Sequence, residues 1–110
     1  MNPEGKSSNP KEIEMAAMKR LHDSLSIPDY SMANHLANAI TAQRYCIPGK
    51  IKKAEMPEVM LLDRALILED VVDAMIMLSM LGQQHSYRYL YDLVSSRWVS
   101  MDRPPCSSII

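Results

Sequence analysis

The chain has 110 residues, a formal net charge of -1 and a sequence pI near 6.3. This length predicts one domain with a modest core, and the nearly balanced charge excludes binding to nucleic acid or membranes through total charge alone. Any such surface must come from charges that are segregated along the sequence.

The first helix is predicted over residues 10–25. Asn9 can cap it, Pro10 suits its first position, and apolar residues recur every four positions from Ile13. Residues 1–8 are rich in Gly, Pro, Ser and Asn and have little to bury, so they predict a disordered lead-in.

A second helix is predicted over residues 31–46, after a break at Pro28. Asp29 or Ser31 can cap its start. The sequence IPGK ends it, because proline disfavours a helical conformation in the residue before it and glycine accepts the geometry of a turn.

The third and fourth helices are predicted over residues 57–81 and 86–98, where apolar residues follow the three-and-four spacing of a helix. Gly82 is placed to end the third helix in a left-handed conformation. Residues 100–110 predict a flexible tail, so the single helical domain spans 9–99. No segment alternates long enough to form a strand. The predicted fold class is all-α, a compact bundle of about four helices.

Charge is segregated along the middle of the chain. Residues 30–54 contain no acid, whereas residues 55–74 contain six acids and the single cation Arg64. Amides and cations before this divide can bind phosphates, base edges or an acidic protein surface. The candidate partner- or nucleic-acid-binding residues are Asn34, Asn38, Arg44, Lys50, Lys52 and Lys53.

The connection after the second helix is predicted to be exposed and ordered. We expect Pro48 and Gly49 to turn the chain and Ile47 and Ile51 to anchor it to the core. Its lysines and Arg44 should then project as one positive patch. The acids of the third helix, in contrast, are expected to form a solvated face, or one that meets a basic partner, and to hold no metal.

A helix-turn-helix is the DNA-binding motif that the first two predicted helices could form, with the helix over 31–46 as the recognition helix. When the first two predicted helices are aligned with this motif, His22 falls where a small residue is needed. His35 falls where an apolar residue packs between the two helices. Both mismatches count against the motif.

The methionines suggest a different surface. The chain has ten methionines and no phenylalanine, and Met75, Met77 and Met80 lie where the third helix is apolar all round. Burying every side of that segment in so small a chain requires a central position or a second copy. We predict a homodimer with these three residues at its interface.

No catalytic residues are predicted. The three histidines lie on different elements without ligand spacing, so we expect no enzyme activity, no metal and no cofactor.

Cys46 and Cys106 fit a reducing compartment better than a disulfide scaffold, with Cys46 as a small buried residue. The start of the chain lacks a signal-peptide pattern, and acids interrupt the apolar stretch 59–81. We therefore predict a cytoplasmic protein that does not contact membranes.

Two classes of function remain open. The leading one is a non-enzymatic regulatory or adaptor protein that binds another protein as a helical homodimer. The alternative is a small dimeric DNA-binding transcriptional regulator, of the bacterial or phage type, that uses the helix over 31–46 and the loop from Lys50 to Lys53.

Overall fold

The computed structural model describes residues 9–99, which form an all-α bundle. The helices are α1 (Pro10–Ser24), α2 (Tyr30–Arg44), α3 (Glu58–Met80) and α4 (Tyr87–Trp98), and a short 3-10 helix, η1 (Lys53–Glu55), precedes α3. The four predicted helices are confirmed, with every end within two residues of its predicted position. The helix η1 was not predicted. The predicted lead-in 1–8 and tail 100–110 lie outside the described residues.

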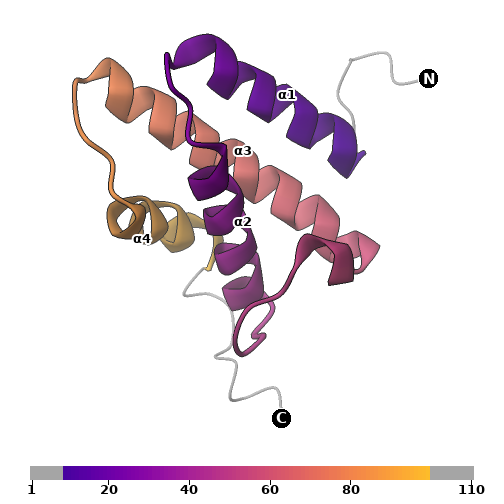
Figure 1. The fold of residues 1–110 in the computed structure, drawn as a ribbon. Helices are drawn as coiled ribbons and strands as arrows, with labels where there is room; N and C mark the ends of the chain where they lie inside the picture. The colour runs from indigo at the N-terminus through magenta and orange to yellow at the C-terminus, as the bar shows by residue number, and fades with distance from the viewer. Residues whose placement is uncertain (1–8, 100–110) are drawn as a thin grey trace.

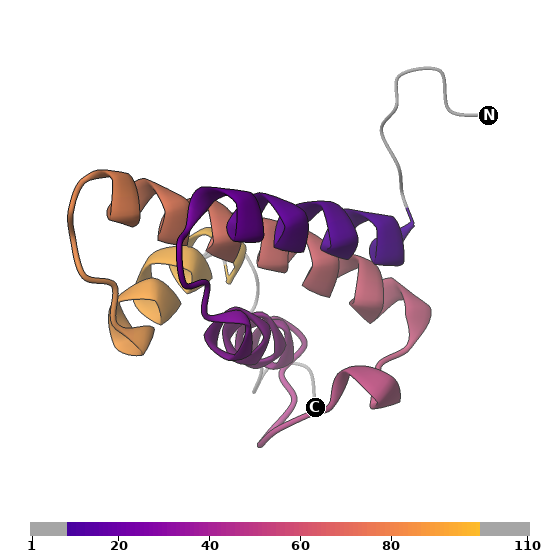
Figure 2. The ribbon, with the colours of Figure 1, turned by 45° about the horizontal axis from the view of Figure 1, so that its top comes forward.

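The central element of the bundle is α3, which contacts each of the other three helices. α1 lies alongside α3 and runs in the same direction (Figure 1). α2 crosses α1 and α3 steeply, so that Figure 2 shows it almost end-on. α4 packs against α2 and α3. All four helices contribute to one core, with fully buried Leu21 from α1, Leu36 from α2, Val71 from α3 and Leu90 from α4.

Side-chain caps begin three of the helices. The carboxamide oxygen of Asn9 accepts a hydrogen bond from the N–H of Lys11 at 2.9 Å, as predicted. Asp29 caps α2 by accepting from the N–H of Met32 at 3.0 Å, and Ser86 caps α4. Each cap satisfies a backbone donor that has no partner inside its helix.

The ends of α2 and α3 share one geometry, in which a residue with positive φ reverses the chain. Gly82 has φ of 70° after α3, as predicted, and Cys46 has φ of 59° after α2. The next residue bonds back across the turn, from Ile47 N–H to Ala42 O at 2.8 Å and from Gln83 N–H to Leu78 O at 2.9 Å. These bonds satisfy helix carbonyls that would otherwise have no partner. Cys46 is half-buried and disulfide-bonded, which differs from the predicted apolar thiol.

The central position of α3 changes the predicted dimer surface. Met75 is fully buried in the core of the single chain, so it cannot lie on a surface that meets a second copy. Met77 and Met80 are 45% and 82% exposed. The prediction for Met75 is wrong because α3 is covered by three other helices, whereas Met77 and Met80 remain candidates. Among residues 9–99, no helix, α3 included, is both long and apolar enough to cross a membrane.

Replacing Gly82 with Ala should lower the free energy of unfolding by about 1 kcal/mol, because L-residues with a Cβ disfavour the left-handed conformation. A Cβ at this position would meet no atom within 4 Å, so the cost is conformational rather than steric. Gly82→Asn is the matched control, and should cost less because Asn tolerates this conformation. Urea denaturation of the three proteins measures the difference, and equal stability of all three would contradict the assignment.

Candidate functional site

A buried arginine joins three helices of the bundle. Arg64 of α3 is 1% exposed and donates two hydrogen bonds to α2, from Nε to Asn38 Oδ1 at 2.5 Å and from Nη2 to Asn34 Oδ1 at 2.7 Å. Its Nη1 lies 3.1 Å from Glu14 Oε1 of α1. That nitrogen is not aligned for a hydrogen bond, so the attraction to Glu14 is coulombic.

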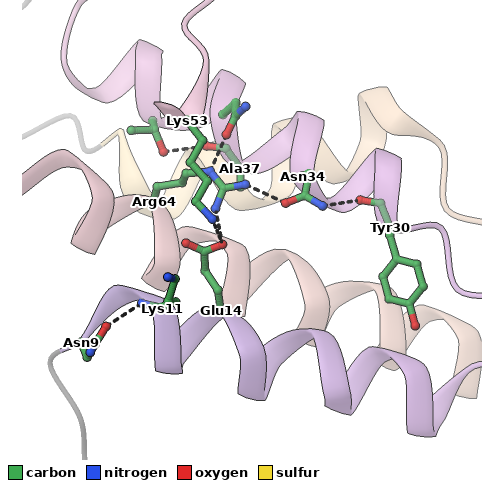
Figure 3. Close-up of polar contacts among 10 residues, drawn as sticks. Asn9, Lys11, Glu14, Tyr30, Asn34, Ala37, Lys53 and Arg64 are labelled. Atoms are coloured by element: carbon green, nitrogen blue, oxygen red, sulfur yellow. Dashed lines mark hydrogen bonds and ion pairs between the residues drawn. The ribbon is translucent and has the colours of Figure 1, made fainter. Parts of the chain in front are cut away.

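The same carboxylate also holds the connection before α3. Lys53 Nζ of η1 lies 2.8 Å from Glu14 Oε1, so one carboxylate oxygen serves two cations. Figure 3 shows the resulting chain of contacts from Lys53 through Glu14 and Arg64 to Asn34, whose own amide nitrogen donates to Tyr30 O. We call Glu14, Asn34, Asn38, Lys53 and Arg64 the Arg64 cluster. It ties α1, α2, α3 and η1 together.

Burial lowers the pKa of Arg64, and the negative charge of Glu14 opposes that shift. An arginine stays protonated even so, because the guanidinium group does not lose its proton in proteins. The cluster therefore holds a permanent positive charge in the interior. Such a charge is tolerated only while its partners remain in place.

A second cluster fixes the last turn of α4 against α2 and α3. Arg44 Nε lies 3.3 Å from Asp63 Oδ2, and its Nη1 donates to Trp98 O at 2.5 Å. The guanidinium also lies over the Trp98 ring, 5.4 Å from its centre. Tyr45 donates to the same carboxylate oxygen of Asp63 at 2.6 Å. These contacts occupy Arg44 within the chain.

The acids of α3 form the predicted solvated face only in part: Glu58 and Asp73 are exposed, whereas Asp63 and Asp70 are partly buried. Asp63 is taken by Arg44 and Tyr45. Asp70 accepts from Trp98 Nε1 at 2.9 Å and from Arg97 at 3.2 Å, while the exposed Asp73 pairs with Arg20 of α1. Part of the predicted face is therefore internal, because α2 and α4 supply cations and ring donors to it.

A groove of about 730 Å³ lies between α2, the 47–52 loop and the start of α4. One side of α2 lines it, and the small side chains of Ala39 and Ala42 leave room for the hollow. The lining residues of α2 are His35, Asn38, Ala39, Ala42 and Gln43. The volume falls in the range of about 300 to 1,000 Å³ that is typical of ligand sites in proteins. We call this hollow the groove.

Two stacked tyrosines form the α4 side of the groove. The rings of Tyr87 and Tyr91 lie 6.3 Å apart and are inclined by 21°. Tyr91 donates its hydroxyl hydrogen to Gln43 Oε1 at 2.5 Å, which links α4 to α2 along the edge of the groove. Burial raises the pKa of Tyr91, so the hydroxyl keeps this hydrogen at neutral pH. Tyr87 is 42% exposed.

The loop side of the groove carries its charge. Lys50 and Lys52 both line the hollow and are exposed, and neither forms an ion pair with any residue in the described range. As predicted, Gly49 turns the chain, with φ of 83°, and Ile51 is half-buried. No residue lining the groove is acidic. The groove is therefore apolar on its walls and positive at one rim.

The six residues predicted to bind a partner do not share one surface. Lys50, Lys52 and Asn38 line the groove. Asn34 and Lys53 belong to the Arg64 cluster and do not line it. Arg44 is bound to Asp63. Asn34, Arg44 and Lys53 therefore do not project beside Lys50 and Lys52. The single positive patch of four cations is thus wrong, because two of the four are paired inside the chain.

The helix-turn-helix register also fails in the structure. α1 and α2 each pack on α3 rather than mainly against one another. His35, which that register places between the two helices, is exposed at the edge of the groove. Within residues 9–99, no group of three or more His, Cys, Asp or Glu side chains is placed to hold a metal ion.

Sequence reasoning missed the partnership of Glu14 and Arg64. Both residues occupy positions that otherwise belong to apolar stripes: Glu14 is three residues before buried Ala17, and Arg64 is four residues before buried Leu68. Opposite charges at core positions of two helices are the signal that predicts such a pair.

Replacing Glu14 with Gln should lower the free energy of unfolding by about 3 to 5 kcal/mol, because it leaves the buried charge of Arg64 without its counter-ion. Lys53→Met, which removes the half-exposed partner of the same carboxylate, should cost about 1 kcal/mol or less. The double variant Glu14→Leu/Arg64→Met should recover only part of the loss, because the amide oxygens of Asn34 and Asn38 lose their donor. Urea denaturation measures all three, and equal losses for Glu14→Gln and Lys53→Met would contradict a buried ion pair.

Comparison with known proteins gives no relative from which a function could be carried over. No protein-family model matches the chain, and neither curated proteins nor solved structures give a significant match. What the groove binds must be inferred from its own side chains.

Proposed function

We propose that the protein is a non-enzymatic adaptor that binds an acidic segment of another protein in the groove. The observation that carries this proposal is the charge of the lining: Lys50 and Lys52 have no ion-pair partner among the described residues, and no acid lines the groove. Rim cations of this kind attract an anionic partner and suppress binding of cationic ones. The tyrosine wall offers aromatic area of the type that dominates binding energy in protein interfaces.

DNA binding is the weaker candidate on the same geometry. Asn34, Arg44 and Lys53, which were expected to contact bases and phosphates, are occupied by contacts inside the chain. Two lysines alone make a small phosphate-binding surface, because each phosphate contact contributes one released counter-ion to affinity.

The proposed adaptor acts as a homodimer through the exposed end of α3. Met77, Met80 and the adjoining Leu81 are exposed apolar side chains that follow one another at the end of the helix. Methionine suits such a contact because its flexible side chain adapts to the opposing surface. The groove lies on other elements of the chain, so dimerisation leaves it open.

The cytoplasmic location stays a prediction. It depended in part on the cysteines, and the disulfide of Cys46 weakens that part because disulfides are rare in reducing compartments.

The double variant Lys50→Ser/Lys52→Ser should weaken binding of an acidic peptide about fivefold, since each exposed charge pair contributes up to about 1 kcal/mol. A fluorescein-labelled ten-residue peptide of Glu, Asp and Leu serves as the probe, and fluorescence anisotropy at low salt and near 0.2 M measures binding. The variant should also lose most of the salt dependence. Folding should be unchanged, because surface substitutions usually cost within about 0.5 kcal/mol.

Lys11→Ser/Lys19→Ser is the matched control, because it removes the same charge from the exposed face of α1. It should leave peptide binding unchanged. A nonspecific DNA duplex is run beside the peptide in a mobility shift. The wild-type protein could bind the duplex, lose affinity for it steeply between low salt and 0.2 M, and not bind the peptide. In that case DNA binding replaces the adaptor proposal.

Met77→Glu should convert the dimer to a monomer, because a charge cannot be buried unpaired in an apolar contact. The fold should persist, since Met77 is already half-exposed in the single chain. Sedimentation velocity at high micromolar concentration measures the change, with Met15→Glu on α1 as the control for an exposed methionine outside the surface. A wild-type monomer at that concentration would remove the homodimer from the proposal.

A further inference from the structure

Two side-chain amides line the groove, and both have their oxygen already bonded inside the chain. Asn38 Oδ1 accepts from Arg64 Nε at 2.5 Å, and Gln43 Oε1 accepts from the Tyr91 hydroxyl at 2.5 Å. An amide carries an acceptor oxygen at one end and a donor nitrogen at the other. The internal bonds therefore determine which end of each amide is left for a ligand.

The end that is left is the nitrogen in both cases. Neither Asn38 Nδ2 nor Gln43 Nε2 forms a hydrogen bond with another residue of the described range. Among the described residues, two side-chain polar atoms are buried without a hydrogen-bond partner, Arg64 Nη1 and His85 Nδ1. Asn38 Nδ2 is not one of them. The atom is therefore not fully buried, and its side chain lines the groove.

The side chains that line the groove offer more donors than acceptors, although His35 and the hydroxyl oxygens of Tyr87 and Tyr91 can accept. Besides the two amide nitrogens the groove offers the ammonium groups of Lys50 and Lys52, and the Tyr91 hydroxyl hydrogen is already used within the chain. No carboxylate lines it. A matching ligand must supply several acceptor oxygens and negative charge, because a polar group that is buried without a partner costs about 1 to 3 kcal/mol.

The spacing of these donors favours a peptide over a small anion. Asn38 and Gln43 lie five residues apart on α2, which is about 7.5 Å along the helix axis. An extended peptide offers a backbone carbonyl about every 3.3 Å, and successive carbonyls point to opposite sides. We infer that the groove binds an extended acidic peptide through its backbone carbonyls, with the nitrogens of Asn38 and Gln43 as donors.

This inference rests on the proposed adaptor function and adds the conformation and chemistry of the partner segment. The carboxylates of the peptide meet Lys50 and Lys52 at the rim. An apolar side chain of the peptide packs against the exposed Tyr87 ring and the half-buried Ile51. Arg64 acts as a positioning residue, because its bond to Asn38 Oδ1 keeps the amide nitrogen directed away from the core.

The test replaces one donor without disturbing the bond that orients it. Asn38→Asp keeps an acceptor oxygen for Arg64 and exchanges the donor nitrogen for a second acceptor. The acidic ten-residue peptide should bind about tenfold or more weakly, because the hydrogen bond to the peptide is lost and an acid enters the groove. Gln43→Glu keeps an acceptor for the Tyr91 hydroxyl in the same way and should give a similar loss.

Asn34→Asp is the matched control, because Asn34 also accepts from Arg64 and lies on α2 but does not line the groove. It carries the same charge change and should weaken binding by about threefold or less, through screened electrostatics alone. Circular dichroism checks that all three variants fold. Gln43→Glu, which is remote from Arg64, keeps the test valid if Asn38→Asp does not fold.

The outcomes separate this inference from the adaptor proposal. Losses that are equal in Asn34→Asp and in the two groove variants would overturn the role of the amide donors, while the loss in Lys50→Ser/Lys52→Ser would still support an acidic partner. Equal inhibition of peptide binding by free glutamate at the same concentration of carboxylate would overturn the backbone contacts. A wild-type protein that binds no acidic peptide would overturn both proposals.

Discussion

The constraint on which the rest of the structure depends is the positive charge of Arg64 inside the core. A guanidinium removed from water needs a counter-ion and acceptors within reach, and neither neighbouring turn of α3 supplies them. α1 must therefore approach with Glu14, and α2 must turn its amide side toward α3. The apolar contacts around Leu36 and Val71 hold the helices together, whereas the charge selects which faces of the helices meet.

The same requirement links the interior to the groove. Lys53 shares the carboxylate of Glu14, so the connection between α2 and α3 is held at one end by the cluster that stabilises the core. Asn38 belongs to both regions, because its oxygen is bonded to Arg64 and its side chain lines the groove. Substitutions in the core can therefore alter the shape of the groove without touching its lining.

Much of the fold was predictable, because it follows from local patterns. Apolar spacing and the caps Asn9 and Asp29 located the helices, and Gly82 located the end of α3. Pairings between distant residues were not predictable. Arg44 looks like a free cation in sequence, and only the packing of α2 against α3 and α4 brings Asp63 and Trp98 to it. Of the groove, the sequence indicated Lys50 and Lys52 by their charge and Asn38 by its amide, but nothing local showed that the oxygen of Asn38 is bonded to Arg64.

The Arg64 cluster also has a consequence for how the chain reaches its native state. The partners of Arg64 on α2 are 26 and 30 residues away, and Glu14 lies further still toward the N-terminus. Contacts of such separation require large loops to close, which slows folding relative to bundles whose contacts are mostly local. A chain in which α2 had docked on α3 without α1 would cover Arg64 in the absence of its counter-ion Glu14. Docking of α1 and α2 is therefore expected to fall within a single kinetic step, and α1 to have little native structure before it.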